Sequence, residues 1–425
     1  MLIMVVQRAN EETLFKETEI GLIPKDWQVM QLGHVADLIM GQSPPSETYN
    51  TKGNGLPFLQ GKAEFGDIYP LPKKWCSKPI KIAQKNDVLV SVRAPVGDVN
   101  IAPFECCIGR GLAAIRPKDG LEPLYLFYYL LTVRQRLESE GRGTTFKAIG
   151  KSVIEKFKIP VPSFMEQQKI AFILSKIQQA IQQQDKIIEA TKNLKKSLMH
   201  KLFTEGTRGE EQKETEIGLI PRSWDIKNLS DVAKLTSGGT PNRRVSQYFG
   251  GTIPWVKSGE LEDNTIFDTE EKITEEGLRN SSAKIFPRGT LLIAMYGATV
   301  GKTAILGIEA ATNQAVCAVF PKNNILTTEF LRYYIIFARH RLLSERFGRA
   351  QPNISQTILR NIRIVIPPLT EQQEIACVLT YIDKKIEIEE RRKATLQQLF
   401  KTMLNKLMTG EIRVKDIDLG VINVS

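Results

Sequence analysis

Residues 297–303 come nearest of any part of the sequence to a motif with known chemistry. They read Gly-Ala-Thr-Val-Gly-Lys-Thr, which is close to the Walker A loop that holds nucleotide phosphates. That loop needs four residues between its two glycines, whereas this segment has three. A related segment, 94–99, keeps Gly97 but has neither lysine nor threonine after it. We interpret both segments as turns of a common scaffold, with a P-loop ATPase carrying a coiled-coil arm as the alternative.

Elsewhere no set of nucleophilic, acid–base or metal-ligating residues stands out. The three histidines do not recur between related parts of the chain, so histidine-based catalysis or zinc binding is not expected. The five cysteines show no CxxC spacing and are odd in number, which favours buried free thiols over disulfides or a zinc site. Serine-hydrolase, zinc-protease, methyltransferase and nuclease motifs are missing from the sequence. The sequence therefore predicts no catalytic residues, no metal site and no cofactor in this chain.

Length and composition predict a basic protein of two or three domains. The chain has 425 residues, of which 42% are hydrophobic, and a formal net charge of +11. It has no run of 18 apolar residues and no features of a secretory signal, so we expect a cytoplasmic protein without a membrane partner. A basic balance favours a polyanionic partner, although an excess of this size also occurs in proteins that bind nothing charged.

The sequence contains an internal duplication. The nine residues Lys-Glu-Thr-Glu-Ile-Gly-Leu-Ile-Pro occur at 16–24 and again at 213–221. Similar residues continue after both copies at the same offset of 197, among them Trp27 and Trp224. The offset later becomes 205, where Glu-Gln-Gln recurs at 166–168 and 371–373. A period near 200 residues is too long for a solenoid repeat, so we expect two whole domains, each followed by a similar segment.

Each repeat has a globular part followed by a helical part. The globular part contains short apolar runs, such as 87–92 and 290–295, which are typical of buried strands and are separated by turn residues. A predicted helix follows, at 123–137 in one copy and 328–347 in the other. The helical part starts at Glu166, has no glycine or proline up to Thr204, and carries a seven-residue apolar pattern that polar residues interrupt.

The second copy repeats this helical pattern, and the two helices are expected to pair. Neither apolar stripe can be buried by one small domain, so we predict an antiparallel coiled coil about 57 Å long. The alternative is a long amphipathic helix lying on its own domain. Ser163 and Thr370 are the expected N-caps of the two helices. The predicted fold is therefore α+β, with two globular domains related by a pseudo-twofold axis and separated by two long antiparallel helices.

These patterns divide the chain into five segments. They are a conserved N-terminal segment at 1–24, a first globular domain at 25–162, a central helical region at 163–212, a second globular domain with its leading segment at 213–369, and a C-terminal helix and tail at 370–425. Residues 25–162 and residues 222–370 each contain 19 basic and 13 acidic side chains. This equal basic excess, together with the divergence of the loops, argues against a third hypothesis, a structural coiled-coil adaptor without a DNA role.

Short motifs recur in the same order in both repeats. Leu-Ile-Pro-x-x-Trp precedes each globular domain, and Glu-Gln-Gln opens each long helix. The second domain adds Gly-Gly-Thr-Pro at 238–241, Ile-Pro-Trp-Val-Lys at 253–257, Thr-Asn-Gln-Ala at 312–315 and Gln-Pro-Asn-Ile-Ser at 351–355. The first domain departs from these motifs at 57–60, 108–110 and 146–148. In this order the motifs resemble those of the specificity subunit of Type I restriction-modification enzymes.

The resemblance implies that the globular parts are target recognition domains and that the helices are conserved spacers. It implies a subunit without catalytic activity of its own, which directs two methyltransferase subunits, and with them restriction subunits, to a bipartite sequence in double-stranded DNA. S-adenosylmethionine, ATP and Mg²⁺ are then expected on the partner subunits. The methyltransferase subunits are expected to dock on the flanks of the helices and on the adjoining domain surfaces. The flanks carry Lys195-Lys196 and Arg391-Arg392-Lys393, although such residues also suit a plain solvated face.

Two antiparallel helices would give the domains a symmetry that DNA shares. Each domain could then meet the major groove in an equivalent orientation, with half-sites about one helical turn apart. Because the copies differ most in their loops, we expect the domains to read two unlike half-sites. We also hypothesise that the length of the helices sets the number of unread base pairs between the half-sites.

Candidate base-reading side chains lie in glycine-flanked loops. Arg and Lys suit guanine, and Asn and Gln suit adenine, in the major groove. The candidates are Lys62, Arg93, Arg110, Arg142 and Lys147 in the first domain, and Arg243, Arg244, Lys257, Tyr296, Asn313, Gln314, Arg349, Gln351 and Asn353 in the second. For each of them the alternative is a phosphate contact or a solvated side chain. Asn and Gln in tight turns can also hold their own loop together.

Overall fold

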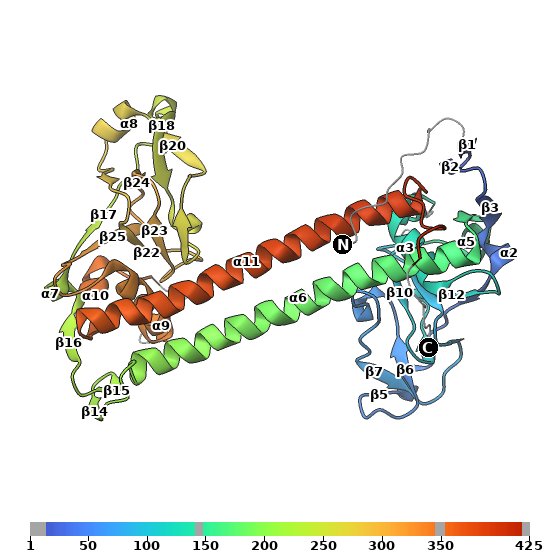
Figure 1. The fold of residues 1–425 in the computed structure, drawn as a ribbon, viewed down its shortest axis with the longest axis horizontal. Coiled ribbons are helices and arrows are strands. Elements are labelled where there is room, and N and C mark those ends of the chain that lie inside the picture. Colours follow the sequence, from blue (N-terminus) through green and yellow to red (C-terminus); the bar gives the residue numbers. More distant parts are fainter. Residues whose placement is uncertain (1–13, 141–147, 345–352, 419–425) are drawn as a thin grey trace. The chain divides into compact units, whose positions relative to one another are not determined.

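The computed structural model describes residues 14–140, 148–344 and 353–418, in two compact units (Figure 1). The first unit comprises residues 1–185 and 391–425, and the second comprises residues 186–390. Each unit contains one globular domain together with part of the helix α6, Phe164–Thr204, and part of the helix α11, Leu369–Met408. The units are described separately below.

The first unit contains a four-stranded antiparallel sheet, a five-stranded mixed sheet and a group of short helices. One sheet has the strand order β10-β9-β12-β4 and the other β5-β7-β6-β11-β8, and two-stranded pairs β1-β2 and β13-β3 lie outside them. The strands are β1 Phe15–Thr18, β2 Gly21–Pro24, β3 Gln28–Gln31, β4 Ala36–Met40, β5 Tyr49–Asn50, β6 Leu56–Leu59, β7 Lys74–Cys76, β8 Ile82–Ala83, β9 Val88–Ser91, β10 Val99–Ile101, β11 Cys106–Ile108, β12 Leu112–Pro117 and β13 Lys158–Val161. The helices are α2 Leu32–Val35, α3 Pro123–Thr132, α4 Arg134–Ser139, α5 Lys151–Lys156 and the 3-10 turns η1 Ser46–Thr48 and η2 Lys62–Glu64.

The second unit has a comparable set of elements. Its sheets have the strand orders β17-β25-β22-β23-β19 and β20-β18-β24-β21, with outer pairs β14-β15 and β16-β26. The strands are β14 Gln212–Thr215, β15 Gly218–Pro221, β16 Asp225–Asn228, β17 Ala233–Ser237, β18 Phe249–Val256, β19 Asn264–Ile266, β20 Glu271–Ile273, β21 Ile285–Phe286, β22 Leu291–Ala294, β23 Thr303–Leu306, β24 Ala310–Thr312, β25 Val316–Pro321 and β26 Arg363–Ile366. The helices are α7 Leu229–Val232, α8 Glu275–Arg279, α9 Thr328–Ser344, α10 Gln356–Arg360 and the 3-10 turns η3 Ser246–Tyr248 and η4 Ser258–Glu260.

The central strand of each domain is buried on both faces, which explains its continuous apolar run. In β9, Val88 and Val90 pack into the core that contains α3, whereas Leu89 between them packs into the core on the opposite face. In β22, Leu291 and Ile293 alternate with Leu292 and Ala294 in the same way. Successive side chains of a strand point to opposite faces, so a strand with a core on each side is apolar at most positions. The buried Ser91 at the end of β9 is the exception, and its hydroxyl donates to the Pro95 carbonyl at 2.8 Å. The predicted strands and the α+β class are confirmed.

The pairing of α6 with α11 is visible within each unit. In the second unit, Lys192 contacts Glu390 at 2.7 Å, and Lys195 contacts Asp383 at 2.5 Å, so residue numbers rise along one helix as they fall along the other. In the first unit, Lys393 contacts Asp185 at 2.5 Å. These contacts confirm the predicted antiparallel coiled coil over the alternative of a helix lying alone on its domain. The pseudo-twofold relation between the domains stays a prediction.

A buried indole–carboxylate hydrogen bond joins each domain to the first turn of its long helix. We refer to these two bonds as the helix-start contacts. In the first unit the Trp27 indole N–H donates to Oε2 of Glu166 at 3.1 Å, and in the second the Trp224 indole N–H donates to Oε2 of Glu371 at 3.0 Å. The four side chains are at most 1% exposed. The contacts give a physical role to the tryptophan of Leu-Ile-Pro-x-x-Trp and to the first residue of Glu-Gln-Gln.

The second residue of Glu-Gln-Gln also holds each helix to its domain. The side-chain oxygen of Gln167 accepts from the backbone N–H of Glu122 at 2.9 Å, while its nitrogen donates to the carbonyls of Gly120 and Pro162. Gln372 makes the corresponding three bonds to Thr327, Ile325 and Pro367. Substitution of either glutamine should lower the stability of its unit, because three backbone groups would then lose their hydrogen-bond partner.

The segment that follows the far end of each helix closes over a helix-start contact in its own unit. In the first unit Arg413 lies 2.8 Å from Glu166 and 2.7 Å from Asp26. Gly410, with φ +73°, packs so closely that a Cβ there would lie 2.3 Å from Pro24. In the second unit Gly206, with φ +69°, occupies the equivalent position beside Trp224 and Glu371. A glycine is needed at both positions because of the left-handed backbone and the close approach.

The two predicted N-caps have different outcomes. Ser163 precedes α6, and its hydroxyl accepts from the backbone N–H of Glu166 at 3.3 Å, as expected for an N-cap. The prediction for Thr370 is wrong, because α11 begins at Leu369 and Thr370 lies inside its first turn. Its hydroxyl instead accepts from the guanidinium of Arg208 at 3.0 Å. Both helices start two residues before Glu-Gln-Gln, at Phe164 and at Leu369. Pro368 therefore occupies the position of Ser163 and precedes the helix, where a missing backbone N–H costs no helical hydrogen bond.

We predict that Trp224→Phe destabilises the second unit by about 1–3 kcal/mol, because it removes a donor from a fully buried carboxylate. The measurement is urea unfolding of the full chain, followed by a probe in the unit that carries the substitution. Trp75→Phe is the matched control, since Trp75 is only half-buried on β7. Equal losses for the two variants would show that the helix-start contact contributes no more than ordinary packing.

Candidate nucleic-acid interface

Three loops meet at one edge of the strands in the second domain. The strands β18 and β24 are parallel, so both end at the same edge, and backbone bonds then connect the loops that leave them. Asn313 donates its backbone N–H to the Val256 carbonyl at 3.0 Å, and Met295 donates to the Ala315 carbonyl at 2.8 Å. We call residues 257–260, 295–301 and 313–315 the second loop cluster.

The first domain has the same arrangement at the ends of β6, β9 and β11. The strands β6 and β11 are parallel, Gly109 donates to the Leu59 carbonyl at 2.8 Å, and Val92 donates to the Gly111 carbonyl at 2.9 Å. We call residues 60–64, 92–97 and 109–111 the first loop cluster. Because the same backbone bonds hold both clusters, positions in one can be matched to positions in the other.

The matched positions carry unlike exposed side chains. They pair Gln60 with Lys257, Arg93 with Tyr296 and Arg110 with Gln314. Five of these six residues are among the sequence candidates, and all six are exposed except Lys257, which is half-buried. Gln60 was missed because a glutamine at the end of a short strand carries no signal by itself. Only its equivalence to Lys257, through the Leu59 and Val256 carbonyls, identifies it.

The motifs of the second domain hold the loop cluster in place. The Trp255 indole N–H donates to the Gly239 carbonyl at 3.0 Å, and a Cβ on Gly238 would lie 2.0 Å from the carbonyl oxygen of Thr312. Gly-Gly-Thr-Pro and Ile-Pro-Trp-Val-Lys therefore pack against the start of Thr-Asn-Gln-Ala. In the first domain Phe58 takes the place of the tryptophan and stacks on Tyr49, with ring centroids 4.5 Å apart.

Two of the amide candidates make contacts within the second domain. The side-chain oxygen of Asn313 accepts from the backbone N–H of Ala315 at 3.1 Å, so it holds its own turn together, as the sequence alternative stated. The side-chain oxygen of Gln314 accepts from the Thr240 hydroxyl. Gln314 is exposed, and its amide nitrogen is the group available to donate outward.

Acidic side chains pair with two cationic candidates in the second domain. Arg243 lies 2.6 Å from Glu271, and Lys257 lies 2.8 Å from Glu270 and 3.0 Å from Glu271. Arg243 also stacks over Phe249 and Trp255, at 4.6 and 5.0 Å from the ring centroids. Hydrogen bonds from Arg243 and Lys257 lower the pKa of Glu271, and bonds to both glutamates raise the pKa of Lys257. These cations are therefore oriented and partly neutralised before any ligand arrives.

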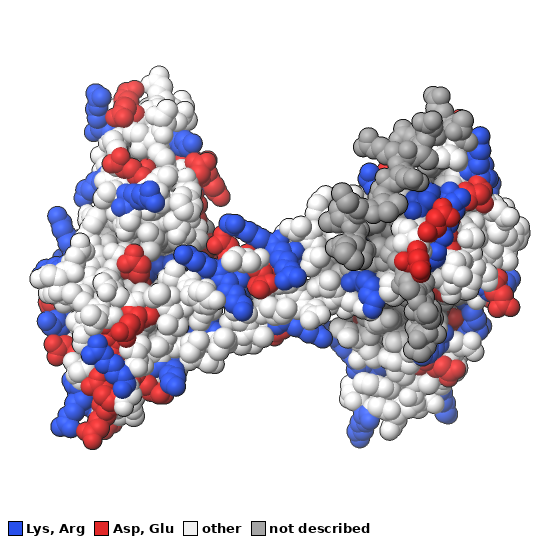
Figure 2. Space-filling model, in the orientation of Figure 1, with Lys and Arg blue, Asp and Glu red and all other residues white. Residues whose placement is uncertain are grey.

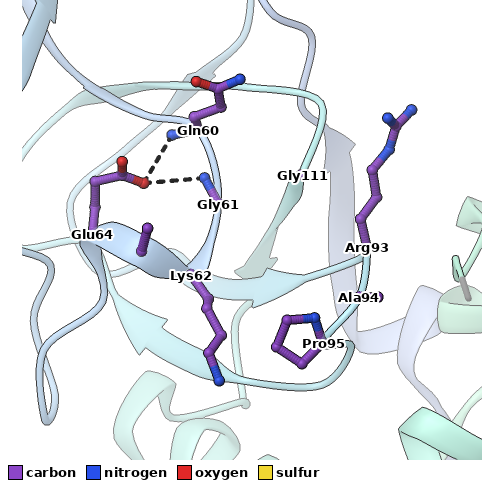
Figure 3. A pocket seen from close by; sticks show the side chains of 9 residues that line it. Gln60, Gly61, Lys62, Glu64, Arg93, Ala94, Pro95 and Gly111 are labelled. Atoms are coloured by element: carbon purple, nitrogen blue, oxygen red, sulfur yellow. Dashed lines mark hydrogen bonds between the residues drawn. The ribbon is translucent and has the colours of Figure 1, made fainter. Parts of the chain in front are cut away.

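The first domain has a concavity beside its loop cluster (Figure 3). Its volume is about 340 Å³, and it is lined by residues 60–64, 93–95 and Gly111. Gln60 and Arg93 extend to one side of the loops, whereas Lys62 extends to the other. Lys62 lies 2.8 Å from Asp98, which also contacts Arg134 at 3.1 Å. Arg93 and Lys62 are both exposed, and Lys62 is paired with a carboxylate.

The remaining candidates are separate from these contacts or are not described. Arg110 donates its backbone N–H to Ser43 and has an exposed side chain, and Arg244 and Asn353 are exposed as well. Arg142, Lys147, Arg349 and Gln351 lie outside the described residues. The side chains of these four are therefore untested, and whether any candidate contacts DNA stays a prediction.

The face drawn in Figure 2 carries charges of both signs rather than one dominant basic patch. On this face, lysines and arginines alternate with aspartates and glutamates over both units. Among the described residues, no group of three or more His, Cys, Asp and Glu side chains could hold a metal ion.

Cys76, Cys106, Cys107 and Cys317 are buried free thiols, as predicted, whereas the prediction is wrong for Cys377, which is exposed. The exposure follows from its place on the outer face of α11.

The segment 297–303 belongs to the second loop cluster and to β23. Its Lys302 forms an ion pair with Glu262, and the Thr303 hydroxyl donates to Asp263 at 3.0 Å. Both side chains that would bind a phosphate and a magnesium ion in a Walker A loop are therefore engaged by carboxylates. This arrangement agrees with the interpretation of the segment as a scaffold turn.

A family model described as "Type I restriction modification DNA specificity domain" matches residues 24–192 and 221–398. The chain belongs to this family. The two matches coincide with the two repeats, and each includes one globular domain and most of the helix that follows it. The chain is therefore a Type I specificity subunit with two target recognition domains. The alternative of a P-loop ATPase is not supported.

Relatives in the same family extend over most of the chain. The Type I restriction enzyme MjaVIII specificity subunit of Methanocaldococcus jannaschii is 28% identical over 98% of this chain and 100% of its own length. The putative type I restriction enzyme MjaX specificity subunit of that organism is 50% identical over 197 residues, so the chain spans about half of it (46%). The crystal structure of the S subunit from M. genitalium has a TM-score of 0.58 and 18% identity, with 90% of this chain and 96% of that chain covered. It shows the same fold. As for membranes, none of the described helices combines the length and the apolar character that a span requires.

We predict that Glu271→Gln strengthens non-specific DNA binding, because it removes the carboxylate that pairs with both Arg243 and Lys257. The plot of log affinity against log salt concentration should become steeper by about 1, because Arg243 is freed to meet a phosphate while Lys257 keeps its ion pair with Glu270. Duplex binding at several salt concentrations measures this slope. Glu276→Gln, an exposed glutamate of the same domain, is the control. An unchanged slope for Glu271→Gln would place these cations away from the DNA.

Proposed function

We propose that each domain of this specificity subunit reads one half of an asymmetric bipartite DNA sequence through its loop cluster. The observation that carries the proposal is the contrast between the clusters. The same backbone bonds hold both, yet the matched positions carry Gln60 and Lys257, Arg93 and Tyr296, and Arg110 and Gln314. A common frame with different exposed side chains is what two unlike half-sites require.

The chemistry of the matched positions supports direct reading of bases. Arginine can donate two hydrogen bonds to the O6 and N7 of guanine, and glutamine can pair with the N6 and N7 of adenine. Arg110 and Gln314 project from equivalent turns, so we infer that they contribute to the reading of different bases. Arg243 and Lys257 are paired with glutamates. We infer that these two cations contact DNA phosphates, which would displace the glutamates.

We further propose that the chain recognises DNA without catalysing a reaction. S-adenosylmethionine, ATP and Mg²⁺ would be bound by two methyltransferase subunits and by restriction subunits, in a cytoplasmic complex. The outer face of α11 supports docking on the helices, because it exposes Val378, Tyr381 and Ile388, which are 40%, 70% and 62% exposed. Their spacings of three and seven residues put them on one face of the helix. One of the related solved structures is described by its complex assembly in a type I system.

Selection from a random duplex library tests the proposal. The full chain, assembled with its methyltransferase subunits, should enrich two short half-sites separated by a constant number of unread base pairs. Arg110→Ala should relax one base in one half-site, and Gln314→Ala should relax one base in the other, each at a cost of about 1–3 kcal/mol. Lys52→Ala, an exposed substitution outside the cluster, is the control. Loss of affinity without a change in the selected sequence would assign phosphate contacts to both residues.

We predict that the spacer between the half-sites follows the length of the helices. An insertion of four residues near the middle of both α6 and α11 adds about one helical turn, or 6 Å, which corresponds to roughly two base pairs. The same library should then yield the same half-sites with a longer spacer. Four alanine substitutions at the same places, without insertion, form the control. A spacer that stays constant would refute this role of the helices.

A further inference from the structure

The nine identical residues of the duplication form a β-hairpin in each unit. In the first unit β1 pairs with β2, and in the second β14 pairs with β15, with the same register. Gly21 and Gly218 turn each hairpin with φ of +108° and +106°, which only glycine adopts freely. Each hairpin is a sheet of two strands, so both of its edges lack a further strand among the described residues.

Most of the nine residues have a structural role that accounts for their identity. The Lys16 ammonium group donates to the Lys25 carbonyl at 3.0 Å, and the Thr18 hydroxyl donates to the Gly21 carbonyl at 2.7 Å. Ile23 and Pro24 are buried, and Glu19 forms an ion pair with Lys158. The second hairpin repeats these contacts through Lys213, Thr215, Ile220, Pro221 and Glu216.

Glu17 and Leu22 are also identical to their counterparts in the second copy, although neither has a structural role of this kind. They are directly opposite each other across the first hairpin, as Glu214 and Leu219 are across the second. Leu22 is 64% exposed and Leu219 is 53% exposed, and the glutamates are exposed too. Within the described part of the chain, neither glutamate makes a side-chain hydrogen bond or ion pair. Each hairpin thus presents the same exposed leucine beside the same free carboxylate.

A recent duplication does not by itself explain this identity, because the unbroken run of identical residues ends on both sides of the hairpin and only scattered matches follow it. Before the repeat, Phe15 corresponds to Gln212, and after it Lys25-Asp26 corresponds to Arg222-Ser223. The matched recognition positions have also diverged. An exposed apolar side chain that stays the same on both copies, while its neighbours change, indicates a surface that must meet the same molecule twice.

We propose that each hairpin is a docking site for one copy of the same protein, which has an apolar pocket for the leucine beside a basic side chain for the glutamate. This inference rests on the proposed function, since the protein required in two copies there is the methyltransferase subunit. The two hairpins give that subunit two equivalent sites, whatever sequence each domain reads. The contact adds to docking on the helices and ties each methyltransferase subunit to one recognition domain.

Co-expression of the full chain with the methyltransferase subunit of its own system tests the proposal. Native mass spectrometry counts the bound copies, and titration measures their affinity. Leu22→Ala or Leu219→Ala alone should leave one site intact and reduce the stoichiometry from two copies to one at limiting concentration. The double variant should weaken binding about tenfold or more at both sites.

Charge reversal and matched controls separate docking from folding. Glu17→Lys combined with Glu214→Lys should weaken binding as the double leucine variant does, with unchanged thermal unfolding of the isolated chain. Leu71→Ala and Phe267→Ala remove side chains that are 69% and 68% exposed elsewhere in the two units, and should leave both copies bound.

The possible outcomes separate the two proposals. If the double leucine variant binds two methyltransferase subunits as tightly as the wild type, the hairpins are not docking sites, and the proposed function is unaffected. A wild-type chain that recruits no methyltransferase subunit would overturn the proposed function, and the docking proposal with it.

Discussion

The buried hydrogen bond between a tryptophan indole and a glutamate carboxylate is the contact on which each unit depends. It joins Trp27 to Glu166 in one unit and Trp224 to Glu371 in the other, at the first turn of a long helix. Burying a carboxylate is costly unless donors surround it, so its neighbours are constrained as well. In the first unit Arg413 supplies further donors to Glu166, and in the second the backbone N–H of Thr207 donates to Glu371 at 2.8 Å. The position of each domain on its helix follows from this requirement.

Features with a repeating pattern were predictable from the sequence, whereas features made by distant loops were not. The duplication, the coiled coil and the central strands each leave a periodic or repeated signal, because burial on a fixed face requires apolar residues at fixed intervals. The role of Gln60 leaves none, since it depends on a backbone bond between Leu59 and Gly109, fifty residues apart. Thr370 shows the limit of local rules, because α11 begins at Leu369, directly after Pro368, and so Thr370 lies inside the helix although its residue type is typical of an N-cap. The pairing of Lys257 with Glu271 was also not predictable, because it depends on the register between β18 and β20.

A net positive charge does not by itself make a DNA-binding surface. Both globular domains have the same basic excess, yet Lys62, Arg243 and Lys257 are each paired with a carboxylate. A polyanion would have to displace those carboxylates, and the geometry of the pairs would then decide where it settles. Arg243 illustrates this point, because Phe249 and Trp255 hold its guanidinium in place while Glu271 neutralises it. A side chain can therefore be well oriented for contact with DNA and still be unavailable, because a carboxylate already pairs with it.

The first unit is built from two separate segments of the chain, residues 1–185 and 391–425. This affects the order in which the two domains can fold during synthesis. Leu407, Met408 and Val414, close to the end of the chain, belong to the same hydrophobic core as Ile23 and Trp27, close to its beginning. The second unit, residues 186–390, is continuous in sequence. The domain that is synthesised second can therefore complete its core first, whereas the domain that emerges first must wait for the last residues of the chain. During synthesis the first domain is consequently the one exposed longest with an incomplete core.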